Sequence, residues 1–554
     1  MRQWLSVSLI AYLLAGPVVT PAAHAADVKT ATPIKHIVII FGENISFDHY
    51  FGTYPYALNP AGEPPFHALA NTPSVNGYGN PANASALLTR NPNLNPENGT
   101  GASNPFRLDR SQAFTQDMDH DYLAEQQAFD AGLMDLFPAH TGFPGPPPSA
   151  PPAVVTTTGL VMGYYDGNTT TAMWNYAQHF AINDNSFGTD FGPSTVGAIN
   201  LISGQTNGVL PSKITGGTGA LVGDGNGGWT VVGDPDPYGD VCSGPAAPNG
   251  EGSTVQMGGT NIGDLLNAAG VTWGWFAGGF NLSIVNSDGS TGCARQSTSA
   301  IAGTQVDYVP HHTPFQYYAS TANPAHNRPI SVSKIGQQGD GANHEYDVQD
   351  FFAAVSAGNF PAVSFLKAIA LQDGHPNNSD PLDEQQFVVY VANFLQNQPS
   401  WSSTALVILY DDSDGWYDHQ LGPIVNTSAT AADALTAPGF CGTGDTALPG
   451  INPATTHAQG RCGYGPRQPL LVISPWAKHN FVDHTLTDQT SVIRFIEDNW
   501  LKGQRIQQGS YDGTANSIST MFDFKQVISD YLYLLNGETG EPTFEGSARA
   551  RATF

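Results

Sequence analysis

Two apolar runs, each followed directly by acidic or amide side chains, constrain the fold of this chain most. The runs are residues 37–41 (IVIIF) and residues 405–410 (ALVILY). Continuous apolar runs of this length are typical of strands buried on both faces, as in a parallel sheet. Ligands of open α/β sheets bind at the carboxyl ends of such strands, so the side chains that follow are expected to meet at one edge. These side chains are Glu43, Asn44, Asp411 and Asp412.

Three carboxylates and an amide at one edge favour a bound cation. Carboxylates held together repel one another unless a positive ion lies between them. Either pair taken alone is more often a helix cap or part of a turn, and that interpretation stays open for each. The two pairs together predict a divalent metal site. Calcium, magnesium, manganese and zinc all accept oxygen ligands, so the identity of the ion stays open.

The rest of the chain alternates between helical and strand patterns. Apolar residues at helical spacing predict helices over residues 260–269, 383–396 and 489–501, and short apolar runs predict strands over 271–276, 362–366 and 469–474. This alternation predicts an α/β fold with a mostly parallel central sheet covered by helices on both faces. Three segments rich in Gly and Pro predict long loop insertions that wall or cover a site; they are residues 58–105, 138–152 and 204–252.

The first 25 residues have the pattern of a secretory signal peptide. Arg2 precedes an apolar stretch over residues 4–14, and Ala23-His24-Ala25 has the small-x-small form of a cleavage site. That stretch is too short for a membrane span, and no later apolar run reaches about 18 residues. The expected organisation is a signal peptide (1–25), one large domain with insertions (26–536) and a flexible tail (537–554). The expected location is the periplasm or the medium, and the oligomeric state stays open.

Charge and cysteine content fit an exported protein that acts on small molecules. The chain has 20 Lys and Arg against 47 Asp and Glu, a formal net charge of −27. Such an acidic surface disfavours nucleic acid and anionic membranes as partners. An even number of cysteines in an exported chain predicts disulfides, with three possible pairings. Closure of the shorter loops favours Cys242–Cys293 and Cys441–Cys462.

One serine and four histidines are candidates for chemistry. Ser194 follows Pro193 and precedes a run that can form a helix, and a helix N-terminus suits an attacking oxygen and a phosphate. For this serine alone, a plain helix cap is the commoner role. Histidines bind phosphate as cations or protonate a leaving oxygen, although a single loop histidine is more often merely solvated. Adjacent carboxylates are expected to raise the pKa of His120 and His375. The four histidines are His120, His311, His312 and His375.

Residues 34–52 (IKHIVIIFGENISFDHYFG) resemble the opening signature of the bacterial phospholipase C/acid phosphatase phosphoesterases, a branch of the alkaline phosphatase superfamily. The resemblance continues through residues 192–194, 201–204, 410–419 and 465–476, and ends near residues 483–485. It implies an alkaline phosphatase-like fold, with the phosphoesterase domain over residues 26–536. It also implies a divalent metal ion held by Glu43, Asn44, Asp411, Asp412 and Ser194.

The resemblance assigns further roles. Ser194 matches the nucleophile, and the histidines at 120, 311, 312 and 375 match those around the phosphate and the leaving group. The phospholipase branch usually has threonine followed by Asp-Pro-Asn-Arg at the nucleophile, and Asp-Glu at the second metal pair. This chain has Ser194 followed by Thr-Val-Gly-Ala, and Asp411-Asp412. Both differences point to the acid phosphatase branch.

The expected function is therefore an exported acid phosphatase that hydrolyses small phosphate monoesters through a phosphoserine, with an optimum below neutral pH. One alternative is a phospholipase C acting on phosphatidylcholine-type lipids, which needs an aromatic cage for a quaternary ammonium. Trp273, Trp275 and Phe276 are candidates for that cage, although packing within a buried strand is the commoner role. Another alternative, from a different class, is an inactive exported protein that binds phosphate without turnover.

Overall fold

The computed structural model describes residues 29–145, 153–435, 441–442, 448–451, 458–528 and 531–547. The predicted signal peptide therefore lies outside the described residues. The last part of the predicted loop 138–152 and the last residues of the predicted tail lie outside them as well. Among the described residues, no helix combines the length and the apolar character needed to cross a bilayer.

An eight-stranded sheet forms the centre of the described structure. All its strand pairs are parallel except those made by β16, which runs antiparallel to both of its neighbours. The strands, in spatial order, are β13 (Glu345–Asp347), β10 (Trp273–Ala277), β14 (Val363–Lys367), β1 (His36–Gly42), β15 (Thr404–Tyr410), β16 (Leu470–Ile473), β4 (Ala181–Asn183) and β17 (Phe481–Asp483).

The two strands that carry the acidic pairs are neighbours at the centre of the sheet. Every residue of β15 is buried, and every residue of β1 except His36. Such burial explains their continuous apolar sequences. The two strands are parallel, with Gly42 opposite Tyr410. Both polypeptide segments therefore leave the sheet side by side at its carboxyl edge.

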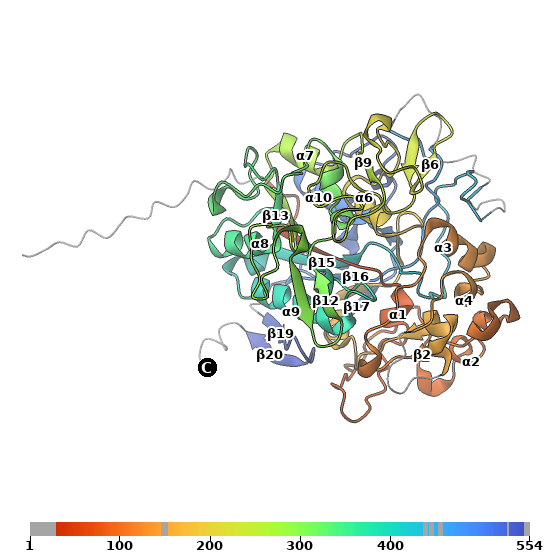
Figure 1. Cartoon of the computed structure of the whole chain (residues 1–554). Helices are drawn as coiled ribbons and strands as arrows, with labels where there is room; N and C mark the ends of the chain where they lie inside the picture. The colour runs from red at the N-terminus through yellow and green to blue at the C-terminus, as the bar shows by residue number, and fades with distance from the viewer. Residues whose placement is uncertain are drawn as a thin grey trace, which may run out of the picture.

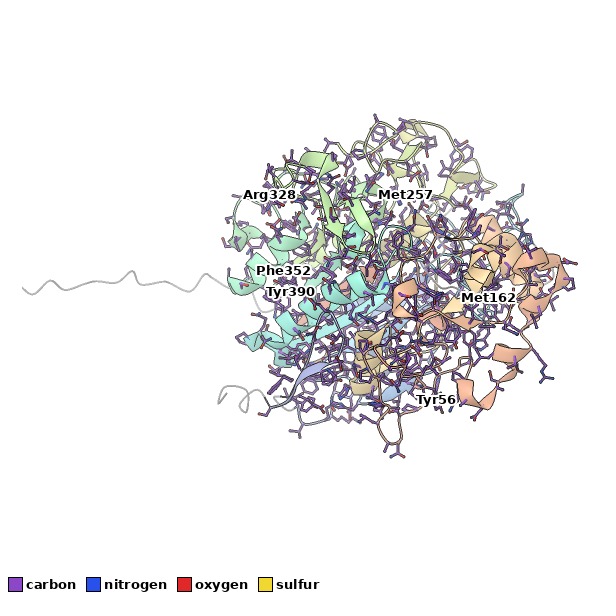
Figure 2. All side chains as sticks on the ribbon, turned by 60° about the horizontal axis from the view of Figure 1, so that its bottom comes forward. Tyr56, Met162, Met257, Arg328, Phe352 and Tyr390 are labelled. Carbon is purple, nitrogen blue, oxygen red and sulfur yellow. A yellow bond between two sulfur atoms is a disulfide. The ribbon has the colours of Figure 1, made fainter. Side chains whose placement is uncertain are left out.

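Helices cover both faces of the sheet (Figure 1). One group contains α6 (Ser194–Ser203), α7 (Ile262–Ala269) and α10 (Thr490–Trp500), and α6 packs against the other two. The other group contains α5 (Thr171–His179), α8 (Val348–Ser356) and α9 (Pro381–Gln396). Phe352 of α8 and Tyr390 of α9 lie edge to face, with ring centroids 4.9 Å apart, which joins these two helices near the surface (Figure 2).

The predicted elements are confirmed, with ends that local capping explains. The helix predicted from residue 260 begins at Ile262, because the side chain of Asn261 accepts a hydrogen bond from the backbone N–H of Asp264. The helix predicted from residue 383 begins earlier, at Pro381, because Asp380 caps it and proline suits the first helical position. The three-residue strands β4, β13 and β17 were not predicted, since such short segments show no periodic pattern.

The loop segments and the tail add smaller elements. Residues 58–105 contain short 3-10 turns and a four-residue helix, and residues 204–252 contain a 3-10 turn and short strands that form two-stranded pairings. Part of the predicted tail is ordered: β20 (Pro542–Ser547) pairs antiparallel with β19 (Tyr531–Leu535). Backbone pairing with β19 needs no apolar pattern, which is why the sequence showed no signal there. Both predicted disulfides, Cys242–Cys293 and Cys441–Cys462, are confirmed.

Candidate active site

Ser194 lies against the two acidic pairs. Its Oγ is 3.1 Å from Glu43 Oε2, 3.1 Å from Asp412 Oδ2 and 3.4 Å from Asn44 Oδ1. Asp411 completes the group, because its Oδ1 accepts hydrogen bonds from the backbone N–H groups of Asn44 and Asp412. The structure thus brings together all five residues that the sequence assigned to a metal site.

Helix α6 reaches this position through a close contact with the end of β15. Ser194 is its first residue, so the helix N-terminus faces the acidic group. A Cβ atom at Gly197 would lie 2.0 Å from the carbonyl oxygen of Asp411, which no side chain tolerates. Glycine at this position therefore allows the approach that places the hydroxyl of Ser194 among the carboxylates.

Asn44 adopts a backbone conformation that few residues tolerate. Its φ is +62°, in the left-handed region, where asparagine is one of the less strained residues. This turn directs its Oδ1 toward Ser194, while its Nδ2 donates to Asp414 Oδ1 at 3.3 Å. Local strain of this kind is concentrated at functional sites.

The donor set fits a divalent cation. A single serine hydroxyl has one proton, yet three oxygen atoms that accept hydrogen bonds surround it within 3.4 Å. Asp411 Oδ2 is buried and has no hydrogen-bond partner among the described residues. Glu43, Asp411 and Asp412 offer ligand atoms within 4.8 Å of one another. Oxygen-rich, negatively charged groups of this kind are ligands for hard divalent ions.

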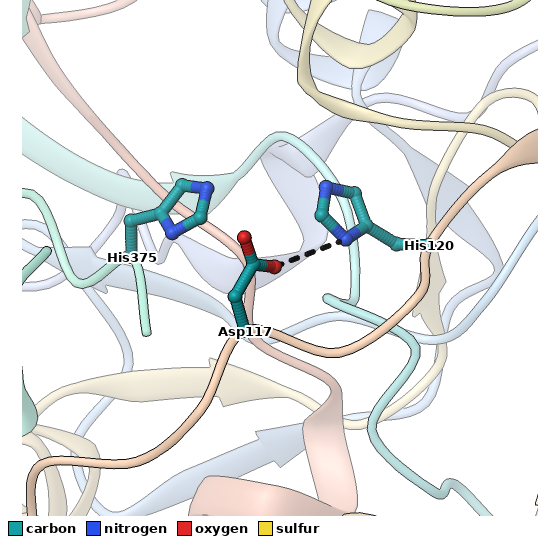
Figure 3. Close-up of side chains that lie close together, drawn as sticks. All are labelled: Asp117, His120 and His375. Carbon is teal, nitrogen blue, oxygen red and sulfur yellow. Dashed lines mark ion pairs between the residues drawn. The ribbon is translucent and has the colours of Figure 1, made fainter. Parts of the chain in front are cut away.

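Asp117 lies between the rings of His120 and His375 (Figure 3). The His120 and His375 ring centroids are 6.1 Å apart, and His120 Nδ1 is 3.6 Å from Asp117 Oδ1. Each Nδ1 also lies within 2.8 Å of a backbone carbonyl oxygen, so each ring's Nε2 is left for other contacts. His120 Nε2 is 3.3 Å from Asn44 Nδ2, which places this ring next to the proposed metal ligands.

The electrostatic surroundings of the histidines differ. Burial lowers the pKa of His120, but Asp412, Asp414 and Asp117 outweigh burial and raise it well above its ordinary value. The expected rise in the pKa of His120 is therefore confirmed, and the rise expected for His375 stays a prediction. Burial, together with His311, lowers the pKa of His312 well below its ordinary value. His312 is therefore a neutral imidazole at neutral pH, with Nδ1 3.1 Å from Glu43 Oε1.

His311 adds a pH-dependent prediction. Burial lowers the pKa of this imidazole, but its ion-pair partner Asp236 and the nearby Asp234 and Glu251 outweigh burial and raise it to about 9. Because the pKa in the folded state exceeds the ordinary value of 6.5, the charged ring stabilises the fold fully below that pH. The stabilisation, on the order of 3 kcal/mol, is lost as the pH rises through about 9.

We therefore expect His311→Gln to lower the free energy of unfolding at pH 6 and to have little effect at pH 10. Urea unfolding of the wild type and the variant at both pH values measures this difference. His67→Gln, at an exposed histidine, serves as the control. An equal loss of stability at both pH values would contradict the assignment of a charged His311.

The structure adds site residues that sequence reasoning missed. Lys367 forms an ion pair with Glu43, and Asp373 Oδ2 lies 3.7 Å from His312 Nδ1. Asp414 receives the amide of Asn44, and Asp117 lies beside His120. Lys367 ends strand β14 at the same carboxyl edge as the acidic pairs. The binding of ligands at the carboxyl ends of strands, which pointed to those pairs, therefore points to Lys367 as well. The others depend on loops whose paths the sequence does not reveal.

The three aromatic residues considered for a cation cage lie in the core. Trp273, Trp275 and Phe276 belong to β10 and have no exposed surface. The ring of Trp275 stacks on Phe365 of β14, with centroids 6.0 Å apart. These residues pack the sheet, as the commoner interpretation of a buried strand predicts.

Comparisons with known proteins place this chain in a family. A family model described as "Phosphoesterase family" matches residues 34–501. The chain is 28% identical to a non-hemolytic phospholipase C of Burkholderia pseudomallei over 87% of its own length and 57% of that protein. It is 26% identical to a non-hemolytic phospholipase C of Pseudomonas aeruginosa, over 84% of its length and 53% of that protein. The chain thus spans little more than half the length of these two relatives.

One more relative and one solved structure also match this chain. The chain is 23% identical to phospholipase C A of Mycobacterium tuberculosis, over 89% of its length and 78% of that protein. Among solved structures, a protein in the alkaline phosphatase superfamily from Vibrio parahaemolyticus matches with 11% identity and a TM-score of 0.27. That match covers 68% of this chain and 69% of the other.

Proposed function

Because this chain belongs to the Phosphoesterase family, we propose that it hydrolyses phosphate esters. Ser194 is the nucleophile, and the preferred substrates are the phosphodiesters of phospholipid head groups. The observation that carries the proposal is the hydroxyl of Ser194 within 3.4 Å of oxygen atoms of Glu43, Asn44 and Asp412. The likeness to three bacterial phospholipases C supports the diester substrate.

The residues around Ser194 divide the reaction into two steps. In the first, Ser194 Oγ forms a bond to phosphorus as the bond from phosphorus to the ester oxygen breaks, and a neighbouring carboxylate takes the hydroxyl proton. His120, charged through its acidic neighbours, lies on the side where it can bind the phosphate or give a proton to the leaving oxygen. In the second step, water hydrolyses the phosphoserine. A divalent ion held by Glu43, Asn44, Asp411 and Asp412 supplies positive charge to the phosphoryl group when bound.

A second candidate function is phosphate-monoester hydrolysis, that is, an acid phosphatase. Ser194 in place of threonine, and Asp411-Asp412 in place of Asp-Glu, favour it. A monoester presents three terminal phosphoryl oxygens with up to two negative charges, whereas a diester presents two with one charge, and the positive charge of a bound divalent ion attracts both. Export to the periplasm or the medium is part of either proposal, and the two disulfides fit an oxidising compartment.

A substrate panel separates these functions. We expect kcat/KM for p-nitrophenylphosphorylcholine to exceed that for p-nitrophenyl phosphate by roughly tenfold or more, between pH 5 and 8.5. Phosphatidylcholine in mixed micelles should release diacylglycerol, and a chelator should stop both reactions. The opposite order of rates would favour the acid phosphatase. Phosphate binding without turnover of any ester would identify an inactive binding protein and reject both.

A further inference from the structure

A carboxylate from a distant loop caps the helix that carries the proposed nucleophile. Ser194 is the first residue of α6, and Pro193, which precedes it, has an apolar side chain that cannot cap a helix. Asp234 takes this role, because its Oδ1 accepts a hydrogen bond from the backbone N–H of Thr195 at 2.8 Å. Asp234 therefore contacts the residue that directly follows Ser194.

The segment around Asp234 is fixed by hydrogen bonds on both sides. The backbone N–H of Gly233 donates to the carbonyl oxygen of Ala220 at 3.1 Å, and the carbonyl oxygen of Pro235 accepts the hydroxyl of Tyr317 at 2.6 Å. Asp234 itself is half-buried. The fold thus holds its carboxylate at the N-terminus of α6.

Asp234 also acts on two histidines of the candidate site. Burial lowers the pKa of His311, but Asp236, Asp234 and Glu251 outweigh burial and raise it to about 9. Burial likewise lowers the pKa of His120, and the carboxylates that raise it include Asp234. The negative charge of Asp234 is therefore felt where the phosphate group of a substrate is expected.

The position of Asp234 competes with a phosphoryl oxygen. A phosphoryl group bonded to Ser194 Oγ lies at the N-terminus of α6, where backbone N–H groups bind anions. The carboxylate of Asp234 already accepts the N–H of Thr195, as an oxygen of a phosphate would. The second negative charge of a monoester therefore meets a carboxylate, and repulsion between like charges in a partly buried site weakens binding.

We infer that Asp234 is a specificity-determining residue that disfavours doubly charged phosphate groups and so selects singly charged diesters. The product of head-group hydrolysis is itself a monoester, so the same repulsion favours its release. This inference rests on the proposed function, because it takes Ser194 as the group that attacks phosphorus.

Binding of inorganic phosphate tests the inference without turnover. At pH 8 phosphate is mostly a dianion, and isothermal titration gives its Kd for the wild type and for Asp234→Asn. Asparagine keeps an oxygen that accepts the N–H of Thr195 and removes only the charge, so the Kd should fall by roughly tenfold or more.

Asp264→Asn is the matched control for this titration. Asp264 is also half-buried, and its Oδ2 accepts the backbone N–H of Asn261 at 3.0 Å, at the start of α7. This variant should bind phosphate with the Kd of the wild type.

Relative rates on two esters give a second readout. The ratio of kcat/KM for p-nitrophenyl phosphate to that for bis(p-nitrophenyl) phosphate should rise by roughly tenfold in Asp234→Asn. It should stay unchanged in Asp264→Asn. Both substrates release p-nitrophenol, so they differ in the phosphoryl group and not in the leaving group.

A folded Asp234→Asn protein would overturn the inference if its Kd for phosphate were unchanged, or if both rates changed by the same factor. Asp234 would then only cap α6. If circular dichroism shows that Asp234→Asn does not fold, Asp234→Ser takes its place, because serine also removes the charge and accepts a backbone N–H at a helix start. A wild type that hydrolyses neither ester rejects the proposed function, while the Kd for phosphate still tests the repulsion by Asp234.

Discussion

Replacement of Ser194 by alanine is expected to lower kcat by roughly 10³-fold or more while the protein stays folded. The reason is geometric: Ser194 Oγ is the hydroxyl that lies among Glu43, Asn44 and Asp412, at the N-terminus of α6. Alanine removes the attacking atom and leaves the helix intact, because alanine is the best helix former. Initial rates with p-nitrophenylphosphorylcholine and p-nitrophenyl phosphate, with circular dichroism of both proteins, measure the effect.

Two further variants make this experiment specific. Ser212→Ala, at an exposed serine of a 3-10 turn, controls for a general effect of losing a hydroxyl and should keep the wild-type rate. Ser194→Thr keeps a nucleophilic hydroxyl and should retain part of the activity. A Ser194→Ala protein with a rate near that of the wild type would show that another group attacks phosphorus.

Replacement of Asp412 by asparagine is expected to weaken binding of the divalent ion by about 10- to 100-fold or more, the loss typical even of changes beyond the direct ligands. It removes one of three carboxylate charges and leaves a side chain of nearly the same shape. Turnover at limiting metal concentration should fall in parallel. Isothermal titration with Mn²⁺ gives the affinity, and Asp288→Asn, at a fully exposed aspartate, is the control.

The same variant should stabilise the metal-free protein. Burial, with repulsion from Asp411, raises the pKa of Asp412 well above its ordinary value. Its ionised form thus destabilises the metal-free fold increasingly as the pH rises above the ordinary pKa of 3.8. A neutral amide relieves this repulsion, so Tm with a chelator should rise, while the increase in Tm on adding metal should shrink. Unchanged metal affinity together with an unchanged response of Tm to metal would contradict the role given to Asp412.

The sequence predicted the centre of the fold because burial leaves a local pattern. Strands β1 and β15 are buried on both faces, so they read as unbroken apolar runs, and the residues after them lie at the same edge by the geometry of a parallel sheet. Helices α7, α9 and α10 were predicted from the helical spacing of their apolar residues. The disulfides followed from loop length.

Other features left no local signal. The short strands β4, β13 and β17 are held by pairing with distant neighbours. The contact of Gly197 with Asp411 O, which seats α6, joins residues far apart in the chain. The same is true of His120, which lies beside Asn44, and of His312, which lies beside Glu43.

Sequence alone thus determined which side chains stand at the ends of the central strands, and the resemblance to a known family added Ser194 to the predicted metal site. Only the tertiary structure decided that Lys367 pairs with Glu43, that His312 is neutral while His120 is charged, and that Asp117 lies between two imidazoles. The reason is physical: burial of a strand on both faces shows in its own consecutive residues. The charge felt by a buried group depends instead on every segment packed around it, and here those segments come from loops that are distant in sequence.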